Sequence, residues 1–258
     1  MRPTTRDYVD VDSSPDPASL LAALDKAERL TPHIDARERT YDFLPVGVGV
    51  DIGCGSGRAV ADLRTRGVDA IGVDPSDFLV EASRRRFPDC TFLRGSAAAL
   101  PFRDHSLQWY RAERVYQHLS DPTSALHEAR RVLTPGGTII VEDQDFDSMV
   151  ITSADPALTR RILDSFTNSL PHGRCGSRMR GTLAQAGFTD IAVTAIPAVY
   201  TELDSIMRVP AQAMSLAVDD GILFARQAAS WMADLEQLDR DEAFIVAYLI
   251  FITTARSR

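Results

Sequence analysis

The chain has 258 residues and a mass of 28.3 kDa, with 45% hydrophobic and 25% charged residues. This is the composition of an ordinary globular protein of one or two domains, and it excludes a disordered chain, a collagen-like repeat and a coiled coil. The formal net charge of −8 argues against a nucleic-acid partner, because a face that binds nucleic acid normally carries a basic excess.

The cysteines and the apolar runs indicate where such a chain resides. Three cysteines, Cys54, Cys90 and Cys175, are too few and too scattered for a disulfide framework, so we expect a reducing, cytoplasmic setting. Residues 1–17 are polar and lack the apolar stretch of a signal peptide. The longest apolar run, 243–252, is about half as long as a membrane span. We therefore expect no membrane partner.

Two helices are predicted before the first strand. Leucines and other apolar side chains recur at helical spacing over 18–30, and a second helix is expected over 34–44. We assign residues 1–45 to an N-terminal helical lid. Tyr8 and the arginines of the second helix, Arg37 and Arg39, could close this lid over a ligand.

Strands and helices then alternate along the chain. Short apolar runs predict strands over 46–52, 70–73, 91–93, 106–111 and 138–142. Helices are expected between them over 58–66 and 77–87, and over a stretch that contains 125–133. This alternation, at roughly 20–30 residues, is typical of βαβ units. The fold class is therefore α/β, with a doubly wound, mostly parallel, Rossmann-like sheet.

The remainder of the chain is less regular. Helices are predicted over 155–170, 178–186, 205–218 and 223–238, and two further strands over 191–200 and 248–255 bring the sheet to seven. We divide the chain after the lid into a ligand-binding core, 46–145, and a segment, 146–258, that completes the sheet and carries an inserted helical cap. The apolar side chains of the last helices could form core, a substrate wall or a homodimer face.

The segment 50–57, with the sequence VDIGCGSG, leaves a buried strand and enters a helix. Its glycines allow the backbone to approach a ligand that side chains would exclude. Arg58 stands where the dinucleotide pattern GxGxxG requires its third glycine. Asp51 would repel a pyrophosphate and suits a ligand that is cationic at this point. The loop residues that we assign to the ligand are Gly53, Cys54, Gly55 and Gly57.

A second acid, Asp74, ends the next strand and lies 17 residues after Gly57. An acid at the end of the second strand is where a ribose diol is bound in Rossmann-like folds. Asp74 could instead cap the helix that follows Pro75 and Ser76. Taken with the glycine loop, it indicates a nucleoside ligand that lacks phosphates and carries a positive group.

These motifs resemble the class I S-adenosylmethionine-dependent methyltransferases, most closely the small-molecule branch that includes menaquinone and natural-product methyltransferases. The resemblance covers about 46–145: Asp51–Gly57 is similar to the first motif, Asp74 to the ribose-binding acid, 95–102 to the third motif, and 131–137 to the turn before the fifth strand. It implies S-adenosyl-L-methionine as cofactor. The further residues that we place beside it are Pro75, Ser76, Ser96, Ala97 and Arg111.

The chain also departs from the family pattern. Ser96 stands where the family has an adenine-binding aspartate, Gln108 stands where an aspartate is frequent, and 111–114 replaces a small or amide residue. These departures leave cofactor binding as the expectation and put the chemistry in doubt.

The resemblance implies methyl transfer to oxygen, nitrogen or carbon of a small metabolite, and we expect a secondary metabolite. A general base is needed only where the acceptor holds its proton tightly. His118 is our leading candidate, and Glu113 and Tyr116 are expected nearer the methionine end of the cofactor. Each has an alternative structural role, as a loop-stabilising histidine or a member of a surface ion pair. A non-methylating cyclisation or rearrangement that uses the same cofactor, and a binding protein without a reaction, stay open.

An acidic run, 142–147, places four carboxylates in six residues after the fifth strand. It could be a solvated loop, or it could attract an amine, hold a metal or supply a base with a raised pKa. No histidine stands at ligand spacing in the run, so we predict no metal site.

Overall fold

The computed structural model describes residues 10–258, so the expected role of Tyr8 lies outside the described residues. The helices are α1 (Pro17–Ala27), α2 (Thr31–Tyr41), α3 (Arg58–Thr65), α4 (Asp77–Arg86), η2 (Tyr116–His118), α5 (Pro122–Val132), α6 (Pro156–Ser169), α7 (Cys175–Gln185), α8 (Leu203–Ile206), α9 (Arg208–Asp219) and α10 (Ala225–Arg240). The strands are β1 (Gly49–Ile52), β2 (Ala70–Asp74), β3 (Thr91–Arg94), β4 (Leu107–Glu113), β5 (Leu133–Ile151), β6 (Thr189–Tyr200) and β7 (Val246–Arg256).

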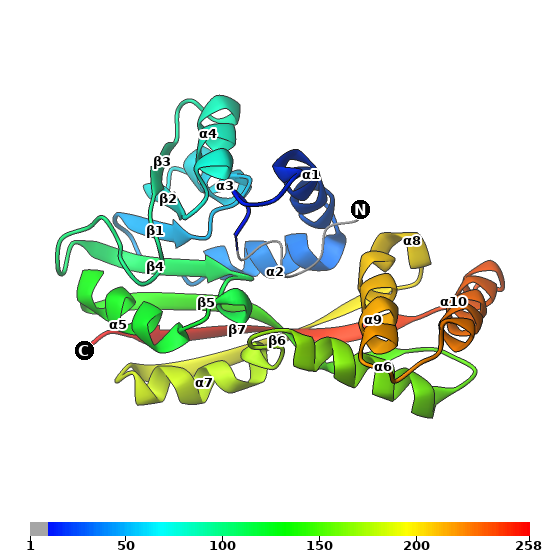
Figure 1. Ribbon diagram of the computed structural model, residues 1–258. Helices are drawn as coiled ribbons and strands as arrows, with labels where there is room; N and C mark the ends of the chain where they lie inside the picture. The colour runs from blue at the N-terminus through cyan, green and yellow to red at the C-terminus, as the bar shows by residue number, and fades with distance from the viewer. Residues whose placement is uncertain (1–9) are drawn as a thin grey trace.

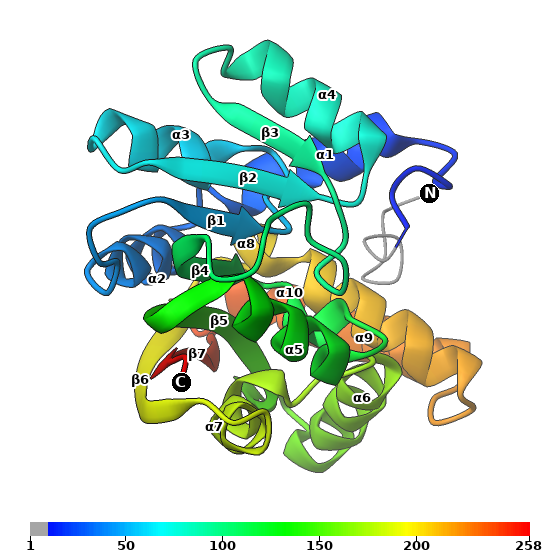
Figure 2. The same cartoon turned by 90° about the vertical axis from the view of Figure 1, so that its left-hand side faces the viewer.

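Within residues 10–258, seven strands form one sheet in the order β3-β2-β1-β4-β5-β7-β6 (Figures 1 and 2). The strands from β3 to β5 are parallel, whereas β7 runs antiparallel to both of its neighbours, β5 and β6. The expected α/β class, with a doubly wound and mostly parallel seven-stranded sheet, is confirmed.

Side-chain alternation along the central strands separates an apolar face from a polar one. Val50 and Ile52 of β1 belong to a buried cluster with α5 and α7. Asp51 between them points to the opposite face, because successive side chains of a strand alternate. The register pairs Asp51 with Arg111 on β4, so two charged side chains lie side by side on that face.

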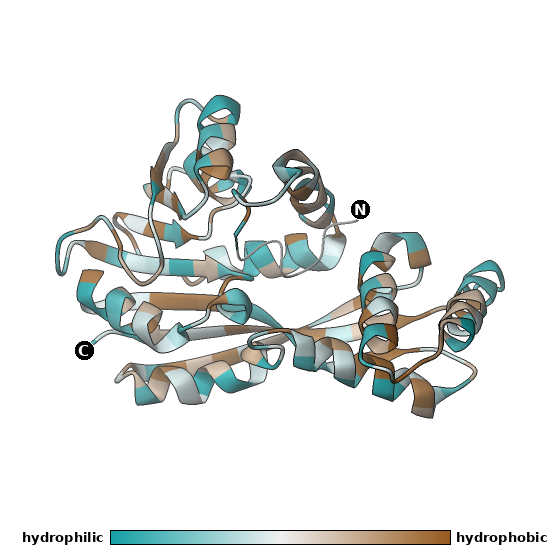
Figure 3. Cartoon of the chain, in the orientation of Figure 1, coloured by the Kyte–Doolittle hydropathy of each residue, from teal (hydrophilic) through white to brown (hydrophobic). Residues whose placement is uncertain are grey.

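A second core forms where three strands extend beyond the parallel part of the sheet. β5 continues to Ile151, nine residues past the predicted end at 142. Its far half, with β6 and β7, packs against α6, α9 and α10 in a separate apolar cluster. Figure 1 shows this extension running beneath α9 toward α10, and Figure 3 shows much of β5 coloured as hydrophobic.

The acidic run lies inside this extended strand. Pairing with β7 continues without interruption from Thr138 to Asp145, and Glu142, Asp143 and Asp145 are each no more than 3% exposed. The prediction of a solvated loop is therefore wrong. The ladder hydrogen bonds to β7 satisfy the backbone of the run and hold these side chains away from solvent.

Membrane-spanning helices and metal-binding clusters are both absent from the described residues. No helix within 10–258 is long and apolar enough to cross a membrane. In the same residues, no three histidine, cysteine, aspartate or glutamate side chains are grouped so that they could hold a metal ion.

Candidate functional site

A cavity of about 640 Å³ opens at the carboxyl ends of β1, β2 and β4, where open α/β sheets bind their ligands. Residues of α1, α2, α8 and the start of α9 also line it. We distinguish two parts. The glycine-loop lobe is lined by Gly53, Cys54, Gly55, Asp74, Ser96 and Ala97, and the aromatic lobe by His33, His118, Gln144, Phe146, Phe166 and Tyr248.

The glycine loop is bent by left-handed residues and fixed by Asp74. Gly53 and Gly55 have φ values of 62° and 52°, which glycine adopts at no steric cost. The Gly55 N–H donates to Asp74 Oδ2 at 3.0 Å. A Cβ on Gly55 would meet only Leu24 Cδ1, at 3.5 Å, and the Gly53 carbonyl oxygen, at 3.8 Å. The space beside Gly55 is therefore cavity rather than packed protein.

Gly57 has a different role. It lies outside the cavity lining, and a Cβ there would come within 2.9 Å of both Phe92 and Ser83. Gly57 therefore has a packing role here, and its assignment to the ligand stays a prediction. Its missing side chain lets the loop and the start of α3 pack closely against β3 and α4.

Asp74 retains acceptor capacity toward the cavity. Its Oδ1 accepts from the Ser76 N–H at 2.9 Å, and its Oδ2 accepts from Gly55, so each oxygen keeps a further lone pair. Burial raises the pKa of this carboxyl to about 6. Ser76 caps α4 by accepting from the Leu79 N–H and donates its own proton to Asp12, while Pro75 lines the cavity beside it. The cap of α4 is therefore Ser76 and not Asp74, whereas Asp74 shapes the turn before the helix and also faces the cavity, and its contact with a ribose stays a prediction.

The other predicted contacts of this lobe are mostly backbone groups. Ser96 and Ala97 line the cavity, and the Ser96 hydroxyl accepts from the Ala98 N–H at 3.2 Å. Cys54 lines it as well, and burial raises the pKa of its thiol well above the ordinary value. The thiol is therefore an apolar wall rather than a nucleophile.

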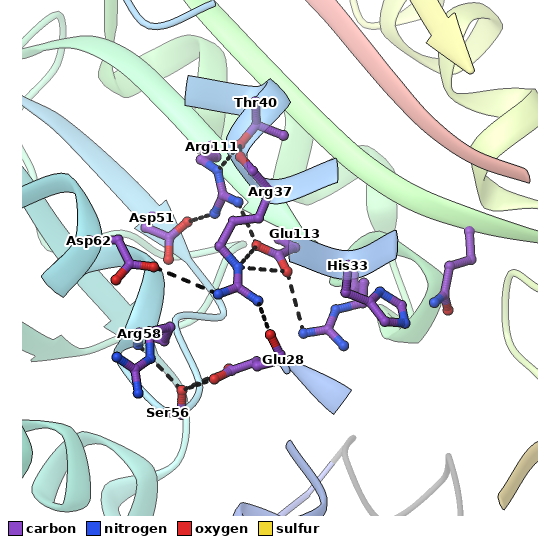
Figure 4. A network of polar contacts seen from close by, with 12 residues as sticks. Glu28, His33, Arg37, Thr40, Asp51, Ser56, Arg58, Asp62, Arg111 and Glu113 are labelled. Atoms are coloured by element: carbon purple, nitrogen blue, oxygen red, sulfur yellow. Dashed lines mark hydrogen bonds and ion pairs between the residues drawn. The ribbon is translucent and has the colours of Figure 1, made fainter. Parts of the chain in front are cut away.

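A buried charge cluster lies beneath the glycine loop (Figure 4). Arg111 donates to Asp51 and to Glu113 at 2.5 Å each, and to the Thr40 hydroxyl at 2.7 Å. Arg37 of α2 lies 3.3 Å from Glu113. The expectation that Asp51 offers a free carboxylate to a cationic ligand is corrected, because Arg111 already neutralises it, although both residues line the cavity.

The arginines of the predicted lid make other contacts. Arg37 also donates to the Glu28 carbonyl at 3.1 Å, so it anchors α2 to the loop after α1. Arg39 is half exposed and pairs with Asp42 on the surface. Both arginines thus make structural contacts, but Arg37 also lines the cavity, so the closure of these side chains over a ligand stays a prediction.

Two of the three candidate catalytic residues, Glu113 and Tyr116, have surroundings that argue against a role in proton transfer. Burial alone would raise the pKa of Glu113, but the guanidinium groups of Arg111, Arg37 and Arg114 lower it well below its usual range. Glu113 is therefore a permanent anion. Tyr116 is fully buried in the core, its hydroxyl lies 2.9 Å from that of Tyr110, and it does not line the cavity. Its predicted contact with the cofactor is corrected.

His118 does line the cavity, in the aromatic lobe. Burial, helped by the positive charges of Arg208 and Arg114, lowers its pKa to about 4. The imidazole is therefore neutral at pH 7, where it is a weak base.

Two carboxylates of the acidic run, those of Asp143 and Asp145, point away from the cavity. Gln144 and Phe146 face the aromatic lobe, whereas Asp143 accepts from the Tyr116 N–H at 3.1 Å and Asp145 from the Ser177 N–H at 3.1 Å. The four carboxylates of the run are absent from the lining among the described residues. The idea that this run attracts an amine is therefore wrong, because strand alternation turns Asp143 and Asp145 to the side opposite Gln144 and Phe146.

The sequence analysis missed a hydrogen-bonded set in the aromatic lobe. The Tyr248 hydroxyl accepts from Gln144 Nε2 at 3.2 Å and lies 3.1 Å from the Tyr200 hydroxyl and 3.4 Å from His33 Nε2. It also missed Glu28, which accepts from the Ser56 hydroxyl at 2.7 Å and lines the cavity. These residues come from separate elements, so no local pattern connects them.

The glycine-loop lobe fits a phosphate-free nucleoside. Asp74 offers free lone pairs to a sugar diol, and the open side of Gly55 accommodates a ligand at the backbone. No arginine or lysine lies among the loop residues 50–57 to bind a phosphate. Arg111 on the adjoining wall is paired with Asp51 and Glu113, so it offers no bare positive charge.

Comparisons with known proteins agree with this fit. Residues 50–141 match the model of a family described as a methyltransferase domain. A demethylmenaquinone methyltransferase of Beutenbergia cavernae is 34% identical over 110 residues, which are 42% of this chain and 46% of that protein. An uncharacterized 37.1 kDa protein in a transposon of Streptomyces fradiae is 29% identical over 94% of this chain and 72% of its own length.

The likeness extends to solved structures. An S-adenosylmethionine-dependent methyltransferase of Thermotoga maritima superposes with a TM-score of 0.61 at 19% identity, over 98% of this chain and all of that one. At this identity the comparison shows a shared fold. The sequence match therefore assigns residues 50–141 to the methyltransferase-domain family, and the superposition shows that the chain has the fold of a solved S-adenosylmethionine-dependent methyltransferase.

Proposed function

We propose that this protein transfers the methyl group of S-adenosylmethionine to a small-molecule acceptor, and that the acceptor is a secondary metabolite. The observation that carries the proposal is one continuous cavity with two chemically different lobes. One lobe presents backbone and a diol-binding acid, and the other presents aromatic rings, two histidines and an amide.

In the glycine-loop lobe we assign Asp74 to the ribose, Ser96 and the Ala97 N–H to the adenine, and Gly53 and Gly55 to the amino-acid tail. When bound, the sulfonium supplies a methyl group that is already activated. The charge cluster of Arg111, Arg37, Asp51 and Glu113, in which two cations balance two carboxylates, then acts as a floor under the loop. Such a floor holds the loop in one geometry, which is what alignment of donor and acceptor requires.

The aromatic lobe excludes water and orients the acceptor. Phe146 and Phe166 pack edge to face with ring centroids 5.1 Å apart, and Tyr248 lies 6.0 Å from Phe146. The cover of the cavity is joined across its mouth by Lys26 of α1, which lies 3.3 Å from Asp204 of α8. A dry pocket strengthens every electrostatic contact within it. In this proposal His118 orients the acceptor rather than removing its proton.

The decisive experiment supplies S-adenosylmethionine with a deuterated methyl group together with an extract of small metabolites. We expect labelled products by mass spectrometry and one equivalent of S-adenosylhomocysteine for each product. The Asp74→Ala variant, as a matched control, should lose most of both signals. Product formed without S-adenosylhomocysteine would favour the non-methylating alternative, and absence of any turnover would favour a binding protein. The cytoplasmic setting and a homodimer stay predictions.

A further inference from the structure

Arg114 is a buried cation with unused hydrogen-bonding capacity. Its side chain is 17% exposed and lines the cavity, and its ion pair in the described part of the chain is with Glu113, at 3.4 Å. Its Nε is buried and has no hydrogen-bond partner among residues 10–258. A guanidinium has five N–H donors, and buried donors left without acceptors cost free energy. The group is therefore poised for an acceptor that comes from outside the protein.

The backbone holds Arg114 in place at a cost. Its φ of 56° lies in the left-handed region that side chains other than glycine rarely adopt. The Arg114 N–H donates to the Glu142 carbonyl at 2.8 Å, which ties this residue to β5 directly after β4 ends. Local strain of this kind concentrates at functional sites.

The carboxylate nearest to Arg114 is already engaged. Glu113 accepts from Arg111 at 2.5 Å and lies 3.3 Å from Arg37, so it serves three cations at once. The positive charge of Arg114 acts on the aromatic lobe, where it adds to burial in lowering the pKa values of His33 and His118. The cavity thus combines ring walls with a cation that has a donor, Nε, left without an acceptor among residues 10–258, although Glu113 and Glu142 both act on its charge.

On the basis of the proposed function, we propose that the acceptor is a flat, aromatic small molecule that carries a carboxylate, and that Arg114 binds this carboxylate. The rings of Phe146, Phe166 and Tyr248 contact the body of the acceptor. A guanidinium prefers a carboxylate because two parallel N–H donors match its two oxygens. An amine at the same position would meet the charge of Arg114 and is disfavoured.

The first test compares three ligands of similar shape on the protein saturated with S-adenosylhomocysteine: indole-3-acetate, indole-3-acetamide and tryptamine. We expect the acid to bind about ten- to a hundredfold more tightly than the amide in calorimetry, since hydrogen bonds to charged groups are the strong ones. The amine should bind most weakly. Equal or undetectable affinities of acid and amide for the wild-type protein would overturn the proposal.

The second test changes the arginine. Arg114→Gln should bring the acid to the affinity of the amide, and Arg114→Lys should keep part of the preference because the charge remains. Arg85→Gln, an exposed position on α4, is the matched control and should leave the preference intact. A preference for the acid that survives Arg114→Gln would contradict the proposal. If a variant fails to fold, the wild-type affinities for acid, amide and amine still test whether the pocket prefers a carboxylate.

The cofactor itself carries a carboxylate, so a third arm separates the two sources. S-adenosylhomocysteine and 5′-methylthioadenosine, which lacks the amino-acid carboxylate, are titrated into wild type and Arg114→Gln. We expect the same ratio of affinities in both proteins. A selective loss of S-adenosylhomocysteine affinity in the variant would assign Arg114 to the cofactor and overturn the proposal. If wild type binds no S-adenosylhomocysteine, the proposed function fails. Titration of the acid and the amide into the free protein then still tests whether Arg114 binds a carboxylate.

Discussion

The two lobes of the cavity are built by different means. The glycine-loop lobe uses backbone groups and one acid from the ends of β1, β2 and β3 and the loops after them, all between residues 53 and 97. The aromatic lobe takes side chains from α2, β5, α6 and β7, which are separated by up to 215 residues in the case of His33 and Tyr248. A lobe made of backbone suits a ligand that never changes, whereas a lobe made of side chains can be altered one residue at a time.

The largest expected effect comes from removing the guanidinium of Arg111 beneath the glycine-loop lobe. Arg111→Leu leaves Asp51 and Glu113 buried with one guanidinium fewer, and we expect a loss of about 3–5 kcal/mol in the free energy of unfolding by urea. The control Arg39→Leu removes a half-exposed surface pair and should change stability by less than about 1 kcal/mol. Equal effects of the two variants would show that the cluster is not the floor we describe.

A second change fills the glycine-loop lobe directly. Gly55→Val places a branched side chain in the cavity at a left-handed residue, and we expect S-adenosylhomocysteine affinity to fall at least about a hundredfold by calorimetry. Gly67→Val is the matched control, because Gly67 has a φ of 74°, lies outside the cavity lining, and would place a Cβ with no atom within 4 Å of it. The control carries the same backbone strain and should bind normally. Retained affinity in Gly55→Val would mean that the loop is only a turn.

Asp74 should make the affinity of the glycine-loop lobe for S-adenosylhomocysteine depend on pH. Asp74→Ala should weaken S-adenosylhomocysteine about ten- to a hundredfold, through two lost hydroxyl contacts of about 1–1.5 kcal/mol each. The carboxylate is the form that accepts from both hydroxyls, and its pKa in the free protein is about 6. Affinity should therefore fall as the pH drops below about 6, and Asp74→Asn should abolish that dependence. A wild-type affinity that is constant from pH 7 to pH 5 would remove the ribose assignment.

The smallest expected effect concerns the aromatic lobe. His118 has a pKa of about 4, which is too low for an efficient base at pH 7. His118→Ala should therefore reduce kcat less than about tenfold and raise KM, as expected for a wall residue. A loss of about a hundredfold or more in kcat, together with a changed pH profile, would restore His118 as the general base.

The sequence alone predicted the glycine-loop lobe better than the aromatic one, for a physical reason. The bend at Gly53 and the turn at Asp74 depend on neighbouring residues, so a local motif carries them. The alternation of strands and helices likewise predicted the sheet. The course of β5 past residue 142 depends on pairing with β7, about a hundred residues later. The local sequence does not show this pairing, because a run of acidic residues taken alone is typical of a loop. Nothing near Tyr116 in the sequence shows that its hydroxyl meets Tyr110 in the core.

The central claim is that the glycine loop and Asp74 hold a nucleoside cofactor of the S-adenosylmethionine type. Calorimetric titration of S-adenosylhomocysteine into wild type, with Asp74→Ala alongside, tests it most directly. The account predicts saturable heat from a single site and an affinity that drops at least about tenfold in the variant. Absence of heat and of any shift in Tm with wild type, or identical affinities in the two proteins, would contradict it.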